Sequence, residues 1–355
     1  MMRSTKDKDS GISLSRYFRN IVLYIRIHKS LVRKGTIVIA TVTLLILIGT
    51  MNRHHRRHHN RNPPRLRSSH NLPSSLTTSP ILSLYEPGHS QFNKIFTEVP
   101  LLQRWQLSPT THVLRFGLPN LEESLQLSTC ACLLVQGPRA IDDDPADSDE
   151  FVIRPYTPIS TNTQIGSFDL FLKDYGGSTL SNYLTQSLRV GDTISVSHGP
   201  FQVKIQASDF MKKTTIGMIA GGTGITPMIQ AVHAILGDPS STTKIVLLYS
   251  AKVESELYGT KELFDSWMQQ YPERLKVVYT LTQAPGGDGS WTGERGRISQ
   301  SMIAQQFPSP QDEHIMIFLC GPTSMYATFA GPRMDKELTG VLADMGYTQE
   351  QVYKF

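Results

Sequence analysis

Short runs of alternating apolar and polar residues, separated by turn residues, occupy the stretch from about residue 84 to residue 208. The runs are Phe92–Pro100, Thr111–Phe116, Cys130–Gln136, Phe151–Pro158, Ser167–Lys173 and Thr193–Val196. Alternation with a period of two indicates strands with one buried face, and many short strands at this spacing indicate a barrel or a sandwich. We therefore predict a small β-domain over residues 84–208.

The pattern changes over residues 213–355, where short apolar runs alternate with helical patterns. The predicted strands are Thr214–Ala220, Lys244–Tyr249, Leu275–Leu281 and Ile315–Cys320, and the predicted helices are Ile229–Leu236 and Lys261–Gln270. Strands that alternate with helices form an open parallel sheet, and such sheets bind ligands at the carboxyl ends of their strands. We therefore predict an α/β domain over residues 213–355.

One uncharged apolar run, Thr36–Met51, lies near the start of the chain. A helix of this length spans about 24 Å, which is close to the ~30 Å hydrocarbon core of a membrane if the flanking side chains snorkel. A buried core helix is the alternative, but both flanks are basic and no globular pattern precedes the run. We predict a single transmembrane helix over residues 35–52, and its nearly balanced basic flanks leave the orientation open.

The segments on either side of this helix differ in composition. Residues 1–34 mix Ser, Arg and Lys with amphipathic stretches, which is typical of a mitochondrial presequence, although Asp7 and Asp9 depart from that type. Residues 53–83 are basic and then rich in Pro, Ser, Thr and Asn, so we predict a flexible tether. Two arginines interrupt the run His54–His59, which we interpret as a solvated membrane-surface anchor, with a metal or haem site as the alternative.

Charge is distributed unevenly along the chain. Residues 1–85 hold 15 Lys and Arg against 2 Asp and Glu, and the remaining residues hold 20 against 28, so the net charge of +5 conceals an acidic globular body. Nucleic-acid binding is therefore a poor interpretation of the basic isoelectric point. The acidic run 142–150 is predicted to be a solvated loop, because it lacks the glycine of an EF-hand calcium loop. We predict no metal site.

Three cysteines do not make a disulfide framework. Cys130 and Cys132 lie two residues apart on a predicted strand, so we expect both to point to one face. Their spacing is not that of a redox Cys-x-x-Cys pair, and burial in the interior is the favoured interpretation.

The candidate binding groups of the first domain are concentrated in the segment Arg154-Pro155-Tyr156-Thr157-Pro158, which holds a guanidinium, a phenol and a hydroxyl. An arginine suits bidentate contact with a phosphate, and the prolines hold the backbone extended. The next strand places Lys173 and Tyr175 on one face, and the small residues 176–179 lead into a helical turn at Leu180-Ser181. Because backbone N–H groups that open a helix bind anions, the two segments could clamp a pyrophosphate. A β-turn followed by a surface helix is the alternative.

The second domain carries a glycine turn, Gly221-Gly222-Thr223-Gly224, followed by Thr226 at the start of a helix. Glycines let a backbone approach a ligand closely. The turn is neither the dinucleotide motif G-x-G-x-x-G nor a phosphate-binding loop with Lys-Ser/Thr. Cys320-Gly321-Pro322 ends the fourth strand. Glu254 or Glu256 could accept ribose hydroxyls and repel a 2′-phosphate, which favours NADH, with an exposed loop carboxylate as the alternative.

In this order, the segments resemble the ferredoxin-reductase superfamily, and its NADH–cytochrome b5 reductase branch in particular, over residues 84–355. The resemblance implies a β-barrel FAD domain followed by an α/β parallel-sheet NAD domain. The residues it implies for FAD are Arg154, Pro155, Tyr156, Thr157, Lys173, Tyr175, Leu180 and Ser181. For the nicotinamide nucleotide they are Gly221, Gly222, Thr223, Gly224, Thr226, Gly321 and Pro322, to which the ribose argument adds Glu256. Thr179 stands where the family has Lys in its G-G-K-M-S loop.

The same resemblance implies the chemistry. A hydride passes from nicotinamide C4 to flavin N5, and electrons then pass one at a time to a haem iron. Thr157 is implied to hydrogen-bond near N5, and Cys320 is implied to help hold the nicotinamide over the ring. Alignment of the two rings, rather than a general base, is then expected to set the rate.

The C-terminal segments resemble the fungal mitochondrial cytochrome c import-factor flavoproteins, which assist haem attachment to apocytochrome c. These segments are Phe329–Pro332, Gly340–Leu342, Met345–Tyr347 and Val352–Phe355. The resemblance implies an inner-membrane anchor, a flavin domain in the intermembrane space, and cytochrome c, apocytochrome c or haem lyase as partner. The net negative charge of the globular body favours a basic partner such as cytochrome c, because redox partners carry complementary charge. The alternatives are a general NADH–cytochrome b5 reductase of the outer mitochondrial membrane or endoplasmic reticulum, with cytochrome b5 as partner, and a flavin-less scaffold protein.

Overall fold

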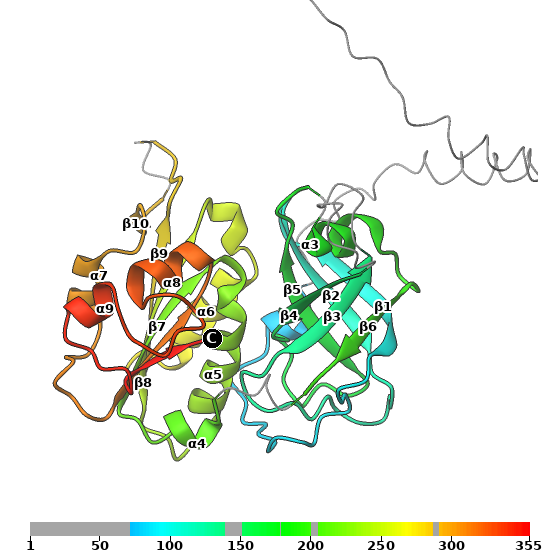
Figure 1. Ribbon diagram of the computed structural model, residues 1–355, viewed down its shortest axis with the longest axis horizontal. Coiled ribbons are helices and arrows are strands. Elements are labelled where there is room, and N and C mark those ends of the chain that lie inside the picture. Colours follow the sequence, from blue (N-terminus) through cyan, green and yellow to red (C-terminus); the bar gives the residue numbers. More distant parts are fainter. Residues whose placement is uncertain (1–71, 139–150, 178, 200–204, 287–290) are drawn as a thin grey trace, which may run out of the picture. The chain divides into compact units, whose positions relative to one another are not determined.

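The computed structural model describes residues 72–138, 151–177, 179–199, 205–286 and 291–355, which belong to one compact unit, Ser68–Phe355. They form two lobes, a half-barrel lobe and a parallel-sheet lobe (Figure 1). The predicted presequence, the predicted transmembrane helix and the histidine run lie outside the described residues. Within the described ranges, no helix has both the length and the apolar character that a membrane span requires.

The half-barrel lobe contains one six-stranded antiparallel sheet. Its strands are β1 Thr97–Gln106, β2 Thr111–Gly117, β3 Leu133–Pro138, β4 Phe151–Tyr156, β5 Ser167–Lys173 and β6 Thr193–Ser197. The order is β4-β3-β6-β1-β2-β5, and every neighbouring pair is antiparallel. β4 and β5 are therefore the two edges, and the short helix α3 Leu180–Asn182 contacts both of them. The predicted β-barrel is an open half-barrel.

Apolar residues of these strands form one core. Phe116 and Phe168 stack with their ring centroids 5.7 Å apart, and Phe92 meets Phe168 edge to face. Phe92 reaches this core from a loop, so the predicted strand Phe92–Pro100 is confirmed only for residues 97–100, and β1 continues to Gln106.

The predicted strand position of Cys130 and Cys132 was also wrong. Cys130 has a left-handed φ of 62° in the turn before β3, and a residue in that conformation does not continue a strand. Cys130 is buried, as expected, and its thiol donates to the carbonyl of Pro227 at 3.3 Å.

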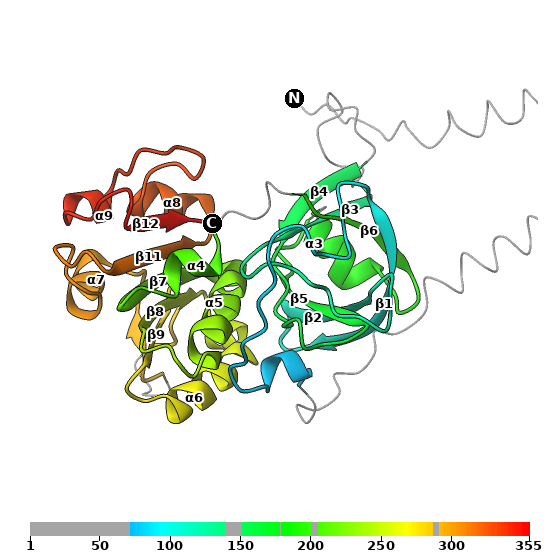
Figure 2. The same cartoon turned by 90° about the horizontal axis from the view of Figure 1, so that it is seen from below.

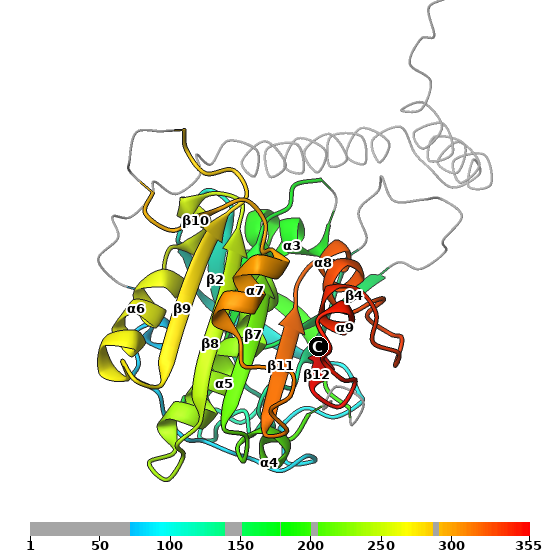
Figure 3. The ribbon, with the colours of Figure 1, turned by 90° about the vertical axis from the view of Figure 1, so that its left-hand side faces the viewer.

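The parallel-sheet lobe has the strand order β10-β9-β8-β7-β11-β12, with all neighbours parallel (Figure 3), which confirms the predicted open α/β sheet. Its strands are β7 Thr215–Gly221, β8 Lys244–Ala251, β9 Leu275–Leu281, β10 Glu294–Arg295, β11 Ile315–Cys320 and β12 Val352–Lys354. Its helices are α5 Ile225–Gly237, α6 Thr260–Gln270, α7 Gln300–Gln306, α8 Thr323–Phe329 and α9 Val341–Asp344, with α4 Ala207–Phe210 preceding β7.

Helices cover both faces of this sheet. Alternate strand residues divide between two cores, so that Met218 packs with α5 and α6 while Ile219 packs with α7, α8 and α9. Figure 2 shows α5 and α6 on one side of the strands and α7 and α9 on the other. We did not predict α7, α8 and α9, because helices of four to seven residues are too short to show a clear period.

Residues 72–83, which we call the strap, contact both lobes. Ser75 donates to the carboxylate of Asp169 in β5. The indole N–H of Trp267 in α6 donates to the carbonyl of Thr78, and the backbone N–H of Ile81 donates to Nδ1 of His233 in α5. The predicted flexible tether was therefore wrong for residues 72–83, because Ser75, Thr78 and Ile81 bind specific partners in the two lobes.

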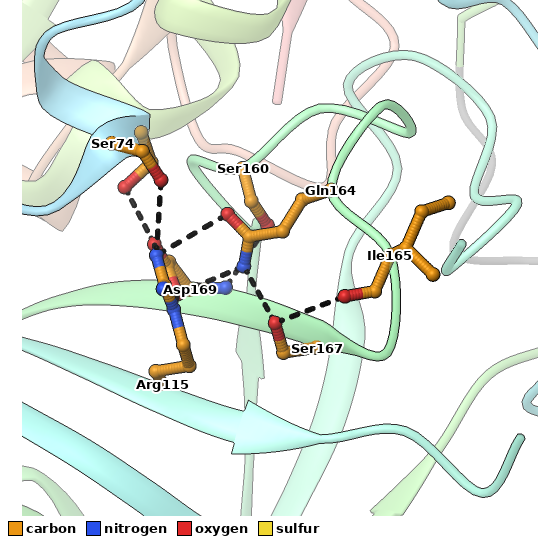
Figure 4. Close-up of polar contacts among 8 residues, drawn as sticks. Ser74, Arg115, Ser160, Gln164, Ile165, Ser167 and Asp169 are labelled. Atoms are coloured by element: carbon orange, nitrogen blue, oxygen red, sulfur yellow. Dashed lines mark hydrogen bonds and ion pairs between the residues drawn. The ribbon is translucent and has the colours of Figure 1, made fainter. Parts of the chain in front are cut away.

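The carboxylate of Asp169 joins the strap to the half-barrel (Figure 4). It is fully buried and accepts from Arg115 Nε at 2.7 Å and Nη2 at 2.8 Å, from Ser75 at 2.7 Å and from Gln164 at 3.1 Å. The backbone N–H of Asp169 donates to the hydroxyl of Ser160. The hydrogen bond with Asp169 raises the pKa of Arg115, so the guanidinium stays charged. This buried ion pair holds four separate chain segments together.

We predict that Asp169→Asn lowers the free energy of unfolding by about 3 kcal/mol, because it leaves the Arg115 guanidinium without its anion. Urea denaturation of residues 68–355 measures the loss. Asp335→Asn changes an exposed carboxylate of the other lobe and is the matched control, expected within about 0.5 kcal/mol of wild type. A loss below about 1 kcal/mol in Asp169→Asn would contradict the assigned role.

Candidate functional site

The first part of the site is the exposed edge strand β4. Arg154 pairs with Val135 of β3, its side chain is exposed, and one of its guanidinium nitrogens donates to the carbonyl of Ile153. Pro155 lacks an N–H group, which an edge strand tolerates. Burial raises the pKa of Tyr156 to about 12, so its phenol is neutral at physiological pH. Thr157 follows the strand directly and is half-buried.

The second part is the loop after β5, which Asp174 organises. The carboxylate of Asp174 accepts from the N–H of Gly176 and from the side chains of Asn182 and Gln186. Burial alone would raise the pKa of Asp174, but these hydrogen bonds lower it overall, so the group stays charged. Gly176 and Gly177 have φ values of 72° and 67°, with open space where a Cβ would stand. The loop therefore presents bare backbone directly after β5.

The helical turn after this loop packs tightly on the sheet. A Cβ on Gly137 of β3 would lie 2.4 Å from Leu180, so the glycine lets α3 approach the strand. The hydroxyl of Thr179 accepts from the N–H of Asn182 and lies 3.0 Å from the hydroxyl of Ser181. Thr179, at the predicted departure from the family motif, is thus the cap of α3.

The third part is the glycine turn between β7 and α5, which contains the 3-10 turn η4 Gly222–Gly224. Gly222 has a φ of 56°. A Cβ on Gly224 would lie 2.1 Å from the carbonyl oxygen of Cys320, so the turn touches the end of β11 directly. The hydroxyl of Thr226 donates back to the carbonyl of Thr223.

Met325 was missed in the sequence and lies between the two glycine segments. A Cβ on Gly221 would lie 2.7 Å from Met325 Cε, and a Cβ on Gly321 would lie 2.5 Å from Met325 Sδ. Pro322 is the N-cap of α8, which carries Met325. The Met325 thioether therefore packs between the ends of β7 and β11. The only sequence feature that indicates this contact is that the two residues facing Met325, Gly221 and Gly321, are both glycines.

The two lobes meet at residues predicted for the two cofactors. The hydroxyl of Tyr175 lies 3.4 Å from that of Thr223. A Cβ on Gly222 would lie 3.5 Å from the hydroxyl of Tyr175 and 4.0 Å from Nζ of Lys173, so Lys173 and Tyr175 point the same way, as predicted. The predicted flavin strand and the predicted nicotinamide turn are adjacent in the folded chain.

Lys173 and Glu256 form a buried ion pair between the lobes. The ammonium and a carboxylate oxygen are 2.8 Å apart, and the side chains are 3% and 12% exposed. Glu256, in the 3-10 turn η5 Glu254–Leu257 after β8, also accepts from the N–H of Lys252. Burial lowers the pKa of Lys173 against the opposing effect of Glu256. Burial would raise the pKa of Glu256, but Lys173 lowers it overall. The roles predicted for the two residues toward flavin and ribose stay predictions.

The residues at this site fit FAD and a nicotinamide nucleotide. Phe151 and Ile153, 52% and 42% exposed, lie on one face of β4, and Arg154 and Tyr156 lie on the other face, because successive side chains of a strand alternate. The bare backbone of Gly176 and Gly177 and the exposed guanidinium of Arg154 suit a pyrophosphate. The left-handed Gly222 leaves open the space beside Tyr175.

Two family models match the chain. Residues 98–203 match an oxidoreductase FAD-binding domain, and residues 218–330 match an oxidoreductase NAD-binding domain. The two matches coincide with the half-barrel lobe and the parallel-sheet lobe.

Curated proteins and solved structures give the same result. NADH-cytochrome b5 reductase 2 of Aspergillus fumigatus is 36% identical over 273 residues, which cover 74% of this chain and 80% of the relative. The enzyme of the same name from Scheffersomyces stipitis is 35% identical over 263 residues, covering 73% and 83%. The cytochrome b5 reductase domain of Ulva prolifera nitrate reductase matches with a TM-score of 0.60 and 26% identity, covering 77% of this chain and all of that domain. The CS-b5R domains of human Ncb5or match in fold, with a TM-score of 0.57 and 19% identity over 73% of this chain and 69% of that one.

We predict that Glu256→Gln destabilises the protein by roughly 2 kcal/mol at pH 7, because the buried Lys173 ammonium loses its anion. The pKa of Glu256 in the folded state lies below its ordinary value of 4.5, so its contribution is present above that pH and is lost as pH falls through the folded value. Urea denaturation at pH 7 and pH 4 should show a smaller difference from wild type at pH 4.

Glu254→Gln, in the same turn, is the control for this variant, and it also separates the two candidate ribose acceptors. A rise in the KM for NADH in Glu254→Gln with no change in Glu256→Gln would move the ribose role to Glu254. A stability of Glu256→Gln equal to that of wild type would contradict the ion pair.

We predict that Arg154→Ala weakens FAD binding by roughly 10- to 100-fold, since a charge-assisted contact with the pyrophosphate is lost. The ratio of flavin absorbance to protein absorbance after dialysis measures the effect. Arg297→Ala, an exposed arginine of the other lobe, should keep its flavin. Full flavin content in Arg154→Ala would remove Arg154 from the FAD site.

Proposed function

Because the chain belongs to the NADH-cytochrome b5 reductase family of FAD-dependent oxidoreductases, we propose that it passes electrons from NADH, through FAD, to a haem protein of the cytochrome b5 type. The observation that carries the proposal is the meeting of the two predicted halves of the site. Tyr175 of the half-barrel lobe contacts Thr223 of the glycine turn, and Lys173 pairs with Glu256 across the same boundary. The names of the fungal relatives support the haem acceptor.

The residues of the chain bind and align the two cofactors. Arg154 and the backbone of Gly176 and Gly177 would hold the FAD pyrophosphate, and Tyr156, as a neutral phenol, can donate a hydrogen bond without adding charge. When bound, FAD supplies the site that takes up a hydride and returns electrons singly.

The other lobe would hold the nicotinamide nucleotide. The glycine turn and the end of β11, which meet at Gly224 and Cys320, form the surface for it. The task of the protein here is to keep the reacting atoms in line, which is worth several orders of magnitude in rate. Thr157 and Cys320 remain the residues expected closest to those atoms.

A basic haem protein is the second candidate acceptor, and one feature of the sequence favours it. Residues 142–150, between β3 and β4, contain six of the acidic residues of the chain. Negative charge joined to the flavin strand would speed encounter with cytochrome c, apocytochrome c or haem lyase. This candidate goes with the cytochrome c maturation role implied by the C-terminal resemblance, whereas the fungal relatives support the cytochrome b5 acceptor.

We further propose that the apolar run Thr36–Met51 anchors the enzyme to a membrane. With a cytochrome b5 acceptor the outer membrane or the endoplasmic reticulum is favoured, and with a cytochrome c acceptor the inner membrane is favoured. Protease protection of the full chain in isolated mitochondria, before and after rupture of the outer membrane, separates the two mitochondrial compartments.

We predict that flavin-loaded protein, residues 68–355, reduces cytochrome b5 with NADH at least tenfold faster than cytochrome c or a haem–apocytochrome c mixture at low salt. Stopped-flow absorbance of the haem measures both rates. Neutralising the six carboxylates of residues 142–150 is the matched control. It should leave the cytochrome b5 rate unchanged or raise it, because cytochrome b5 is itself acidic. A faster cytochrome c reaction that the neutralised variant loses would reverse the order of the two candidates.

A further inference from the structure

Gln230 connects the helix of the glycine turn to the end of the flavin strand. It lies on α5, six residues after Gly224, and is half-buried. Its side-chain nitrogen donates to the carbonyl of Pro158 at 2.7 Å and to the carbonyl of Ser160 at 2.8 Å. Two acceptors at one amide require the NH2 group to face them, so both of its N–H bonds are used. The contact runs from the parallel-sheet lobe to the half-barrel lobe.

The segment that accepts from Gln230, residues 158–160, is also hydrogen-bonded to β5. Pro158, Ile159 and Ser160 are all buried, and they follow Thr157 directly. The N–H of Ile159 donates to the carbonyl of Asp169, and the hydroxyl of Ser160 accepts from the N–H of Asp169. The segment is thus hydrogen-bonded to β5 on one side and to α5 on the other. We therefore expect a displacement of α5 to move the end of the flavin strand.

Other contacts lie on the same side of α5. The carbonyl of Pro227 accepts from Cys130, and His233 accepts from the strap at Ile81. These residues are three apart from Gln230 on either side, so they form one row along the helix. Gln230 differs from both because its contact adjoins the Arg154–Thr157 segment.

We propose that Gln230 is a positioning residue for hydride transfer: by clamping the Pro158 and Ser160 carbonyls, it sets the glycine turn in register with the flavin strand. The inference rests on the NADH-to-flavin half of the proposed function and is independent of the haem acceptor. Gln230 touches neither cofactor in this scheme. It acts through two backbone carbonyls, and since a shift of about 1 Å at reacting atoms costs roughly 100-fold in rate, small movements matter.

The test compares Gln230→Met, which keeps the length and loses the donors, with wild type and with Gln270→Met. Gln270 is an exposed residue of α6 whose side-chain amide donates to Ser266, which makes it a matched control in the same lobe. Anaerobic stopped-flow bleaching of the flavin by NADH gives a limiting rate and an apparent Kd without any haem partner. We expect the limiting rate of Gln230→Met to fall roughly 10- to 100-fold, with an apparent Kd within about threefold of wild type and full FAD content.

A second readout does not depend on turnover. Hydrogen exchange of the peptide covering residues 157–162, measured without NADH, should quicken in Gln230→Met and stay at the wild-type rate in Gln270→Met, because the clamp restrains this segment.

Gln230→Glu adds a pH signature. An ionised carboxylate facing two carbonyls cannot donate, whereas a protonated one donates to one of them. Its rate deficit should therefore shrink as the pH falls from 8 towards the ordinary Glu pKa of about 4.3, and that of Gln230→Met should not.

A wild-type limiting rate in Gln230→Met would overturn the proposal. So would a lowered rate that only matches a loss of bound FAD, because that pattern describes a structural contact and not a positioning one. If instead flavin reduction by NADH is absent in wild type as well, the proposed function itself fails, and this outcome is distinct from a failure of the Gln230 variants alone.

Discussion

The fully buried carboxylate of Asp169 is the contact on which the arrangement of the site depends. It neutralises Arg115 of the neighbouring strand and takes a hydrogen bond from Ser75 of the strap. The backbone of the same residue holds Ile159 and Ser160. One position in β5 thus fixes an adjacent strand, the strap and the end of the flavin segment, and Gln230 attaches the other lobe to that segment. A buried ion pair of this kind adds little net stability compared with apolar packing, but it specifies a single arrangement because its partners have no alternative.

Close backbone approach is the second constraint, and it explains the glycines of the nucleotide lobe. Gly224 touches the carbonyl of Cys320. Gly221 and Gly321 both face the side chain of Met325. A side chain at Gly224 would push against the backbone of Cys320 and separate the ends of β7 and β11, where parallel sheets bind their ligands, whereas a side chain at Gly221 or Gly321 would displace Met325. The motif glycines therefore serve the packing of the sheet as well as the approach of a cofactor.

Local patterns predicted the order of the elements and most of the strands well. β5 and β9 lie at the predicted bounds, because their apolar runs end at clear turn residues. Contacts between distant residues were not predictable. Lys173 and Glu256 are 83 positions apart, and each looked like a ligand contact when considered alone. Gln230 has no sequence signal beyond a polar residue on an apolar helix, since its partners are backbone carbonyls of the other lobe.

The prediction for the strap was wrong for a related reason, and the contacts of the strap determine how far the chain can be shortened. Serine, threonine and proline suggest a tether when no partner is known, yet Ser75, Thr78 and Ile81 each bind a specific partner. A chain that begins before residue 72 keeps all of these contacts. A chain that begins after Ser83 lacks all of them. The strap therefore belongs to the two-lobed body, and a shortened chain keeps that body complete only if it includes residues 72–83.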